Sequence, residues 1–452
     1  MTLKISRILH AGYVFECEDW AIAFDPVFEN PFSRNCHAFP DVRFDHDQIR
    51  RMRFAAVFIS HFHDDHCSFD SLDLLARNTP IYIYCLFPEL FAMVRELGFT
   101  EVHSISTDVP IHVGPFEVIA RAALDSNVDS MFQVRAAGVN VLNVVDAWID
   151  PDDMPALMEA GPWDMVLWPF QTMREIDVLS PSRAVAAPPC LPPEWIEQLA
   201  MLDPRYIVPS SCQFLQEPWS WYNSAFFPIS YRQFEDEVAA GVPAARVLRL
   251  DPSMSVELDA QSLRASAPLP WAQSIGPQDV DYCYQPPAVA PRTADIARNF
   301  PPLDAAQMAR VVSYCGAGLL EKYRSLELEP DSYFSAPRTW RLYVYDHDGN
   351  GRHFDYRIEG DGIDLLADGV RALSWLTEVP AARLYGALEA GEALTSMYMR
   401  INDMVFDDAS EAQIADADIV DDPLIRCLFD DAFGAYQEAQ LRRLKARGGA
   451  QS

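Results

Sequence analysis

Residues 61–66, with the sequence His-Phe-His-Asp-Asp-His, concentrate three imidazoles and two carboxylates in one short segment. The segment follows an apolar run, residues 54–59, that predicts a buried strand, and we expect a helix to begin near Ser68. Side chains alternate along an extended chain, so the first two histidines point to one side, where they can bind one metal. The last aspartate and histidine of the segment can then bind at a second metal position. Packing does not explain the cluster, because unpaired imidazoles and carboxylates are costly to bury. The pattern therefore predicts a metal site.

This His-x-His-x-Asp-His pattern resembles the signature of the metallo-β-lactamase superfamily. Before it, Leu3–Cys17 and Ala21–Asp25 are expected to form two strands, and the second ends in an aspartate as it often does in that superfamily. After it, Val139–Val145 is expected to form another strand, with Asp146 at the position of the superfamily's bridging aspartate. The resemblance extends over about residues 1–250. It implies an α/β fold, an αββα sandwich with the metal at one edge.

Two departures separate the chain from typical hydrolases of that superfamily. Residues 123–130 lack the usual third histidine, and the best-placed ligand there is Asp125. Residues 209–214 contain Cys212 but no Pro-x-His histidine. The second departure resembles the catalytic part of cytidine monophosphate-N-acetylneuraminate hydroxylases, which also have similar segments at 141–146 and 206–223. Those hydroxylases carry a Rieske domain that has no counterpart here, and a histidine at the position of Asp125, so their substrate specificity does not carry over.

The resemblance implies two metal positions that share one bridging carboxylate. The implied ligands are His61, His63 and Asp125 for one metal, Asp65 and His66 for the other, and Asp146 as the bridge. Two imidazoles and one carboxylate with open positions favour non-haem Fe(II) and oxygen chemistry over nitrogen-rich zinc sites. The leading hypothesis is an iron-dependent oxygenase of a small-molecule substrate, with one iron or, preferably, two irons per chain.

An oxygenase needs electrons, which a separate reductase or ferredoxin or the substrate itself must supply. Two alternatives remain open. A zinc or manganese pair would support hydrolysis of an ester, lactone, amide or phosphate bond, and a non-catalytic metal-binding scaffold would use the same ligands without turnover.

Asp65 has a second candidate role, and five further residues are candidates for the site. Asp65 and His10 are the candidate catalytic side chains, although a lone histidine such as His10 is as often structural. Four others are candidates for an additional ligand or for the pocket wall: His37, Arg174, Glu175 and Cys212. Each has an ordinary alternative, namely an exposed loop histidine, a local salt bridge or a buried thiol.

The composition excludes several classes of protein. A formal net charge of −31 argues against nucleic acid and anionic membrane surfaces as partners. Such a surface also disfavours an acidic ferredoxin. The nine cysteines include no C-x-x-C pair, which argues against a zinc ribbon, an iron–sulfur cluster and a disulfide framework. Without a long apolar run or a signal sequence, the expected localisation is cytoplasmic.

The chain is expected to divide into three parts. Residues 1–260 alternate strand and helix patterns and form the catalytic domain, 261–302 are a proline-rich connection, and 303–452 form a smaller α+β domain. In the last part, Thr339–Tyr345 and His353–Ile358 predict a hairpin. Its turn begins like a calcium loop, but Arg357 stands where a bidentate carboxylate is required, so a plain turn is favoured. A terminal helix is expected over Ala432–Arg447.

Overall fold

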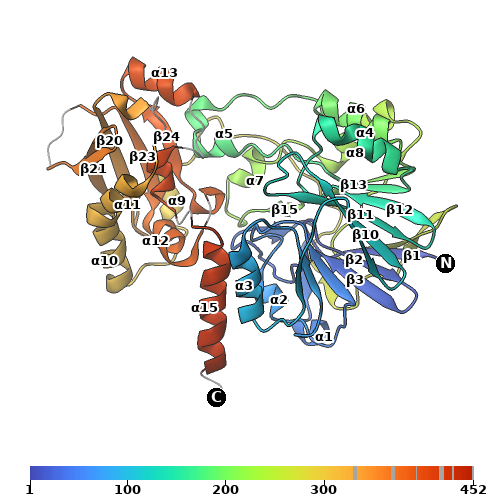
Figure 1. The fold of residues 1–452 in the computed structure, drawn as a ribbon. Helices are drawn as coiled ribbons and strands as arrows, with labels where there is room; N and C mark the ends of the chain where they lie inside the picture. The colour runs from blue at the N-terminus through green and yellow to red at the C-terminus, as the bar shows by residue number, and fades with distance from the viewer. Residues whose placement is uncertain (329–332, 368–371, 393, 417–421, 430–431, 450–452) are drawn as a thin grey trace.

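The computed structural model describes residues 1–328, 333–367, 372–392, 394–416, 422–429 and 432–449. Two large mixed sheets lie face to face, with helices on their outer faces (Figure 1). The first sheet contains, in spatial order, β18 (Leu263–Ser266), β17 (Ser255–Leu258), β1 (Leu3–Arg7), β2 (Tyr13–Cys17), β3 (Trp20–Phe24), β6 (Ala56–Ile59), β7 (Ile81–Ile83) and β8 (Val102–Ser104). The second contains β16 (Arg246–Val247), β14 (Tyr206–Ser210), β13 (Met165–Pro169), β12 (Val139–Asn143), β11 (Ser130–Ala136), β10 (Phe116–Ala122) and β9 (Pro110–Val113). The predicted α/β fold class, an αββα sandwich, is confirmed.

The space between the sheets is filled by apolar side chains from both inner faces. Strand β6 is buried on both sides, so Ala56 and Phe58 face the other sheet while its alternate residues face the helices. The ring of Phe132 in β11 packs against Phe24 and Phe58, with ring centroids 5.0 Å and 6.0 Å away. Burying each such ring contributes about 2 kcal/mol, so this layer holds the two sheets in a fixed relative position.

Helices cover both outer faces of the sandwich (Figure 1). Those beside the first sheet are α1 (His46–Ile49), α2 (Phe69–Leu72) and α3 (Pro88–Glu96), and those beside the second are α4 (Met154–Ala160), α6 (Pro193–Leu202) and α8 (Tyr231–Gly241). The expected helix near Ser68 is α2, whose first turn Ser68 caps through its side chain. Among the described residues, none of the helices has the length and apolar character that crossing a membrane requires.

A second unit follows the sandwich and packs beside it (Figure 1). Its five-stranded sheet has the order β22 (Gly362–Leu365), β21 (Gly351–Glu359), β20 (Arg338–Tyr345), β23 (Trp375–Pro380) and β24 (Arg400–Val405). Its helices include α9 (Thr293–Ala297), α10 (Ala305–Ser313), α11 (Leu319–Ser325), α12 (Ala381–Ala390), α13 (Asp408–Asp416), α14 (Pro423–Arg426) and α15 (Ala435–Gly449). The hairpin predicted across residues 346–350 is β20–β21, and the Asp346 carboxylate accepts bonds from the backbone N–H groups of its own turn. The division at residues 260 and 303 stays a prediction, although β18 extends the first sheet to Ser266.

The sequence expectations fail locally at several strands. Leu3–Cys17 is not one strand but two, because the chain reverses between Arg7 and Tyr13 with His10 at a φ of 46°. The sequence predicts no strand at β11, yet Ser130, inside the segment 123–130 in which a third ligand is expected, already begins that strand.

Several strands that matter for function end at one edge of the sandwich. β3 is parallel to β6, and β12, β13 and β14 are parallel to one another. Asp25 follows β3, residues 60–66 follow β6, and Asp146 lies shortly after β12. Carboxyl ends of parallel strands meet at one edge of a sheet, where sites are usually found.

Arg7 holds this edge together from inside the protein. The side chain is fully buried, and its guanidinium donates to the carbonyl oxygens of Pro209 at 2.9 Å and Leu250 at 3.2 Å and to that of His10. It therefore ties the turn after β1 to strand β14 and to the segment after β16.

We predict that Arg7→Met lowers the free energy of unfolding by about 3 kcal/mol, because it leaves three buried carbonyl groups unpaired. Urea denaturation measures the change. Arg264→Met is the control, since Arg264 is exposed and forms a surface ion pair with Glu257. Equal stability of Arg7→Met and the wild type would contradict the bracing role of Arg7.

Candidate metal centre

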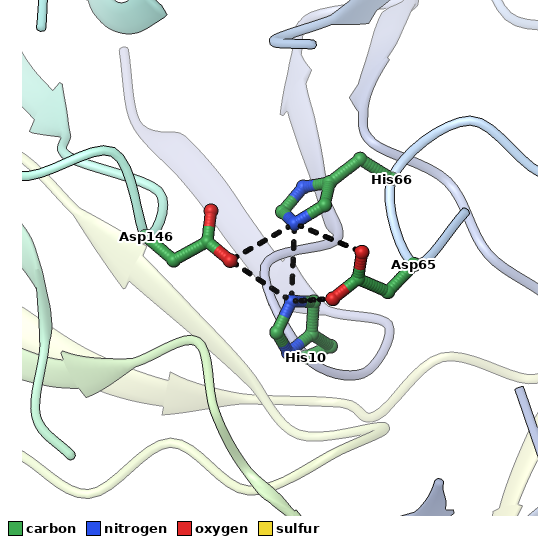
Figure 2. Close-up of side chains that lie close together, drawn as sticks. All are labelled: His10, Asp65, His66 and Asp146. Atoms are coloured by element: carbon green, nitrogen blue, oxygen red, sulfur yellow. Dashed lines mark hydrogen bonds and ion pairs between the residues drawn. The ribbon is translucent and has the colours of Figure 1, made fainter. Parts of the chain in front are cut away.

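Four side chains converge on one point at the edge of the sandwich (Figure 2). His66 Nε2 lies 3.1 Å from Asp146 Oδ2 and 3.7 Å from Asp65 Oδ1. His10 Nε2 lies 3.1 Å from Asp65 Oδ2 and 3.2 Å from His66 Nε2. The four residues come from the turn after β1, the loop after β6 and the end of β12, and one ligand atom from each lies within 4.8 Å of the others. We call them the buried cluster.

A second group, which we call the outer cluster, lies beside the first. It consists of His61, His63 and Asp129, again with one ligand atom from each within 4.8 Å of the others. The His61 ring centroid is 3.9 Å from that of His66, so the clusters are adjacent. His61 is buried whereas His63 is exposed.

Asp25 sets the proton positions on two of these rings. Its carboxylate accepts from the Ser60 backbone N–H at 2.8 Å, from Ser60 Oγ at 2.7 Å and from His66 Nδ1 at 3.0 Å. Because Ser60 Oγ gives its hydrogen to Asp25, it accepts from His61 Nδ1, 2.9 Å away. Both rings therefore carry a proton on Nδ1 and present Nε2 to the metal position, the arrangement expected of metal-ligating histidines.

His10 has the opposite arrangement. The backbone N–H of Cys212 donates to His10 Nδ1 at 3.1 Å, so the proton of the neutral ring lies on Nε2 and points to Asp65. Burial lowers the pKa of His10, but the carboxylates of Asp65 and Asp146 outweigh burial and raise it. A second proton would have to lie on Nδ1, opposite the Cys212 N–H. The geometry therefore makes His10 a neutral hydrogen-bond donor to the site instead of a metal ligand.

Backbone strain is concentrated at the same edge. Positive φ angles occur at His10 (46°), Asp25 (40°), Val145 (63°), Ser211 (47°) and Cys212 (46°), none of which is glycine. Such conformations cost on the order of 1–3 kcal/mol each and persist where surrounding structure enforces them. Val145 is β-branched and directly precedes Asp146, so the fold accepts strain to present that carboxylate.

The carboxylates and rings influence each other's protonation. Burial lowers the pKa of His61 well below its usual value, which keeps the ring neutral. Burial raises the pKa of Asp129 to about 6, only partly opposed by His63. Burial would raise the pKa of Asp146, yet the neighbouring His66 and His10 hold it well below its usual value.

The donor set fits metal ions. Asp129 Oδ1 and Asp146 Oδ1 are buried, and within the described part of the chain neither has a hydrogen-bond partner. Buried carboxylate oxygens without donors are costly, and a cation satisfies them. With His10 as a donor, the ligands are three imidazoles and three carboxylates: His61, His63 and Asp129 for one ion, and Asp65, His66 and Asp146 for the other.

A cavity of about 490 Å³ opens onto both clusters. Its wall includes His10, His63, Asp65 and Asp146 together with the apolar side chains of Phe62, Met173, Phe214 and Phe226. The second unit closes one side with Gly391, Ser396, Ala432, Gly434, Ala435, Tyr436 and Gln437. The cavity is therefore shared by the two units.

Asp125 requires a correction. The structure places its carboxylate in an exposed turn, where it accepts from the Asn127 backbone N–H at 3.1 Å. Its carbonyl oxygen accepts from Val128 and Asp129, so Asp125 shapes the loop while Asp129 reaches the outer cluster. The error follows from the unexpected strand β11, which begins immediately after Asp129.

The remaining candidates lie around the site or away from it. Glu175, the first residue of α5 (Glu175–Leu179), lines the cavity. Arg174 instead donates to Asp177 and to the Val185 carbonyl group. His37, in the short strand β4 (His37–Ala38) paired with β15 (Phe214–Leu215), lines a separate cavity. Cys212 contributes its backbone N–H to His10, and burial raises the pKa of its thiol.

Sequence reasoning noted Asp25 only as the aspartate that ends a strand, and it missed Ser60, Asp129 and the whole contribution of the second unit. Asp25 carried a signal, since an aspartate that closes a buried strand next to the histidine motif needs a partner there. The side chains of the second unit carried none, because nothing in their local sequence refers to the metal motif.

Comparisons with known proteins find similarity only in the fold. No protein-family model matches the chain, and no curated protein matches it. Among solved structures, the metallo hydrolase Igni18 from Ignicoccus hospitalis is 17% identical, with a TM-score of 0.41 over 58% of this chain and 100% of its own. The diiron β-hydroxylase CmlA from Streptomyces venezuelae is 16% identical, with a TM-score of 0.40 over 57% of this chain and 54% of its own. The metallo-β-lactamase fold protein YhfI from Bacillus subtilis is 13% identical, with a TM-score of 0.38 over 57% of this chain and 100% of its own. Similarity at this level does not transfer a function.

We predict that Asp129→Asn weakens one of two metal sites by at least about tenfold, whereas Asp125→Asn leaves both unchanged. The same chemical change is made in one loop, and only Asp129 belongs to the outer cluster. Metal analysis after dialysis against a chelator measures the retained ions per chain. Loss of metal from Asp125→Asn but not from Asp129→Asn would contradict the assignment.

We also predict that metal binding releases a proton from His66. Burial lowers the pKa of His66, but Asp146 and Asp65 outweigh burial and raise it well above the usual 6.5. The metal-free ring therefore holds a proton near neutral pH that the metal must displace. Raising the pH removes this competitor, so apparent affinity should increase by up to about tenfold per pH unit until the ring is neutral. Calorimetric titrations in buffers of different ionisation enthalpy measure the released protons, and a heat independent of the buffer would contradict the prediction.

Proposed function

We propose that the chain is a metal-dependent enzyme that binds two irons at the outer and buried clusters and oxygenates a small molecule. One observation carries the proposal: two adjacent ligand sets, together three imidazoles and three carboxylates, open onto a single cavity. A scaffold that only stored metal would not need a cavity beside its ligands, so the arrangement favours an enzyme.

The balance of ligand types favours iron. The outer cluster combines two imidazoles with one carboxylate, the set typical of non-haem Fe(II) oxygenases. With His10 as a hydrogen-bond donor, the buried cluster adds the carboxylates of Asp65 and Asp146 and the imidazole of His66 as ligands, and hard anionic oxygen stabilises the more highly charged oxidised metal. Bound there, iron would supply the redox chemistry that activates O₂.

The protein's own residues would position the substrate and supply a proton. His10 presents its Nε2–H beside Asp65, next to the positions that reactants would occupy. Cys212 and Arg7 hold the turn that carries His10, so the donor keeps its direction. A buried donor with fixed geometry favours developing negative charge without reorganisation.

The cavity wall suggests a substrate with an apolar part and several polar groups. Four apolar side chains, Phe62, Met173, Phe214 and Phe226, offer contact surface and keep water from that side. Asn35, Gln216 and Gln437 provide amide groups on other parts of the wall. A volume of about 490 Å³ suits a small molecule and excludes a folded macromolecule.

Electrons for the reaction would come from a separate reductase or ferredoxin, or from the substrate. The net charge of −31 disfavours a negatively charged ferredoxin, so a small reductant or a substrate that supplies its own electrons is the preferred source.

Hydrolysis is the second candidate function, because the adjacency of the two clusters also favours it. Two zinc or manganese ions at these positions would prepare a hydroxide at neutral pH. His10 would then serve as the proton donor to a leaving group.

We predict that protein produced without oxygen, in cells supplied with iron, zinc and manganese, contains about two irons per chain. Metal analysis gives the stoichiometry, and Mössbauer spectra of ⁵⁷Fe-labelled protein show whether the irons are coupled. His63→Ala is the matched variant, and it should retain about one iron. Protein that contains two zinc or manganese ions and negligible iron would contradict the oxygenase and favour the hydrolase.

A further inference from the structure

The C-terminal helix α15 lies against the loop that carries the histidine motif, beside α2 and α3 (Figure 1). Gln437, in its first turn, is almost fully buried and also lines the cavity. Its Nε2 donates to the Phe62 carbonyl oxygen at 2.7 Å and to the Cys67 carbonyl oxygen at 3.1 Å. One amide group from the second unit therefore bridges both ends of the segment His63–His66.

That segment forms a compact turn whose shape decides where its ligands point. The backbone N–H groups of His66 and Cys67 both donate to the His63 carbonyl oxygen, at 3.1 Å and 2.8 Å. His63 belongs to the outer cluster, whereas Asp65 and His66 belong to the buried cluster. Opening the turn would therefore move ligands of both clusters at once.

The contact of Gln437 differs from the other contacts of the same helix. Gln440, one turn later, accepts from the Phe69 backbone N–H at 2.7 Å and donates to Ser68 Oγ at 3.1 Å, so it caps α2. Near the end of the helix, the exposed Lys445 pairs with Glu96 of α3. These contacts dock the helix, whereas the hydrogen bonds of Gln437 reach the backbone on both sides of the segment that holds ligands.

The two hydrogen bonds of Gln437 affect stability because they lie in a mostly buried part of the protein. A buried carbonyl oxygen that loses its donor costs about 1–3 kcal/mol unless the backbone moves to find another. For the carbonyl groups of Phe62 and Cys67, such a movement would change the direction of the side chains between them.

We propose that Gln437 is a positioning residue of the metal centre, and that its side-chain amide sets the geometry of the His63–His66 turn. The C-terminal helix is thereby a part of the metal site and not only a wall of the cavity. This inference rests on the proposed metal centre. It assigns to a residue far from the histidine motif in sequence a direct influence on metal affinity and coordination.

The test compares Gln437→Met with the wild-type full chain, using Co²⁺ as the probe. Methionine keeps the length and approximate volume of glutamine but has no N–H group. We expect the affinity for Co²⁺ to fall about 10–100-fold, as for other partners of metal ligands. The visible absorption spectrum of bound Co²⁺ should also change, because coordination geometry changes. A residue that only supported folding would not alter the spectrum of the bound ion.

Two further variants make the comparison specific. Lys445→Ala removes a docking contact of the same helix and should leave affinity and spectrum unchanged. Gln437→Glu keeps the shape but sets a carboxylate oxygen against two carbonyl oxygens, so it should weaken binding at least as much as methionine does. If Gln437→Met does not fold, Gln437→Glu is compared with the wild type in its place.

The possible outcomes separate the inference from the proposed function. Wild-type protein that binds no Co²⁺ would overturn the metal centre itself. Wild-type protein that binds Co²⁺, with folded Gln437 variants of equal affinity and spectrum, would overturn the positioning role alone. An equal effect of Lys445→Ala would also overturn it, because helix docking would then be the cause.

Discussion

A carboxylate buried inside a sandwich, that of Asp25, is the constraint on which the site depends. A buried charge is tolerated only with a full set of donors, and Asp25 takes them from Ser60 and His66. These donors exist only if β3 and β6 are adjacent and parallel, so that both strands end at the same height. The same bonds place the protons of His61 and His66 on the nitrogen atoms that face away from the metal positions. Sheet topology and ligand chemistry are thus consequences of one interaction.

Favourable packing elsewhere in the fold has to compensate for the unfavourable backbone conformations at the site and for the burial of charges between the two units. The positive φ angles at His10, Val145 and Cys212 are unfavourable for these residues, and the packed core between the sheets holds them in place. Docking of the second unit adds ion pairs next to the cavity: Arg383 pairs with Glu217 at 2.8 Å and with Glu392 at 3.2 Å. Glu217 belongs to the sandwich and Arg383 to α12, so the mostly buried pair of Arg383 and Glu217 connects the two units, whereas Glu392 lies in the same unit as Arg383. Separating the pair of Arg383 and Glu217 would leave the Glu217 carboxylate buried without this counter-charge. The pair therefore favours one relative orientation of the two units although the interface is polar.

The sequence predicted the features that depend on short-range patterns. The apolar run before His61, the cap at Ser68 and the aspartate after β12 are local, and the structure confirms the strand, the helix and the position of Asp146 near the histidines. Asp125 was predicted instead of Asp129 because only the start of β11 decides which aspartate reaches the cluster. The protonation of His10 was not accessible either, since it depends on an N–H group 202 residues away in sequence. Gln437 lies 375 residues from Phe62, and no local sequence pattern indicates which residue a buried glutamine contacts.

The two candidate metal positions are not equivalent, and their difference has a physical cause. In the buried cluster, His66 is hydrogen-bonded to Asp25, and the pKa of Asp146 is held low, so the Asp146 carboxylate remains charged over the whole neutral range. The outer cluster includes the exposed His63 and the carboxylate of Asp129, whose pKa lies near 6 because burial is not fully compensated. At the outer position, mild acidification would protonate Asp129, whereas at the buried position the competing proton is that of His66, which the metal-free ring already holds near neutral pH. The outer position borders the cavity through His63 and the buried one through His10, Asp65 and Asp146, so metal binding at the two positions would respond to different pH ranges although both face the same cavity.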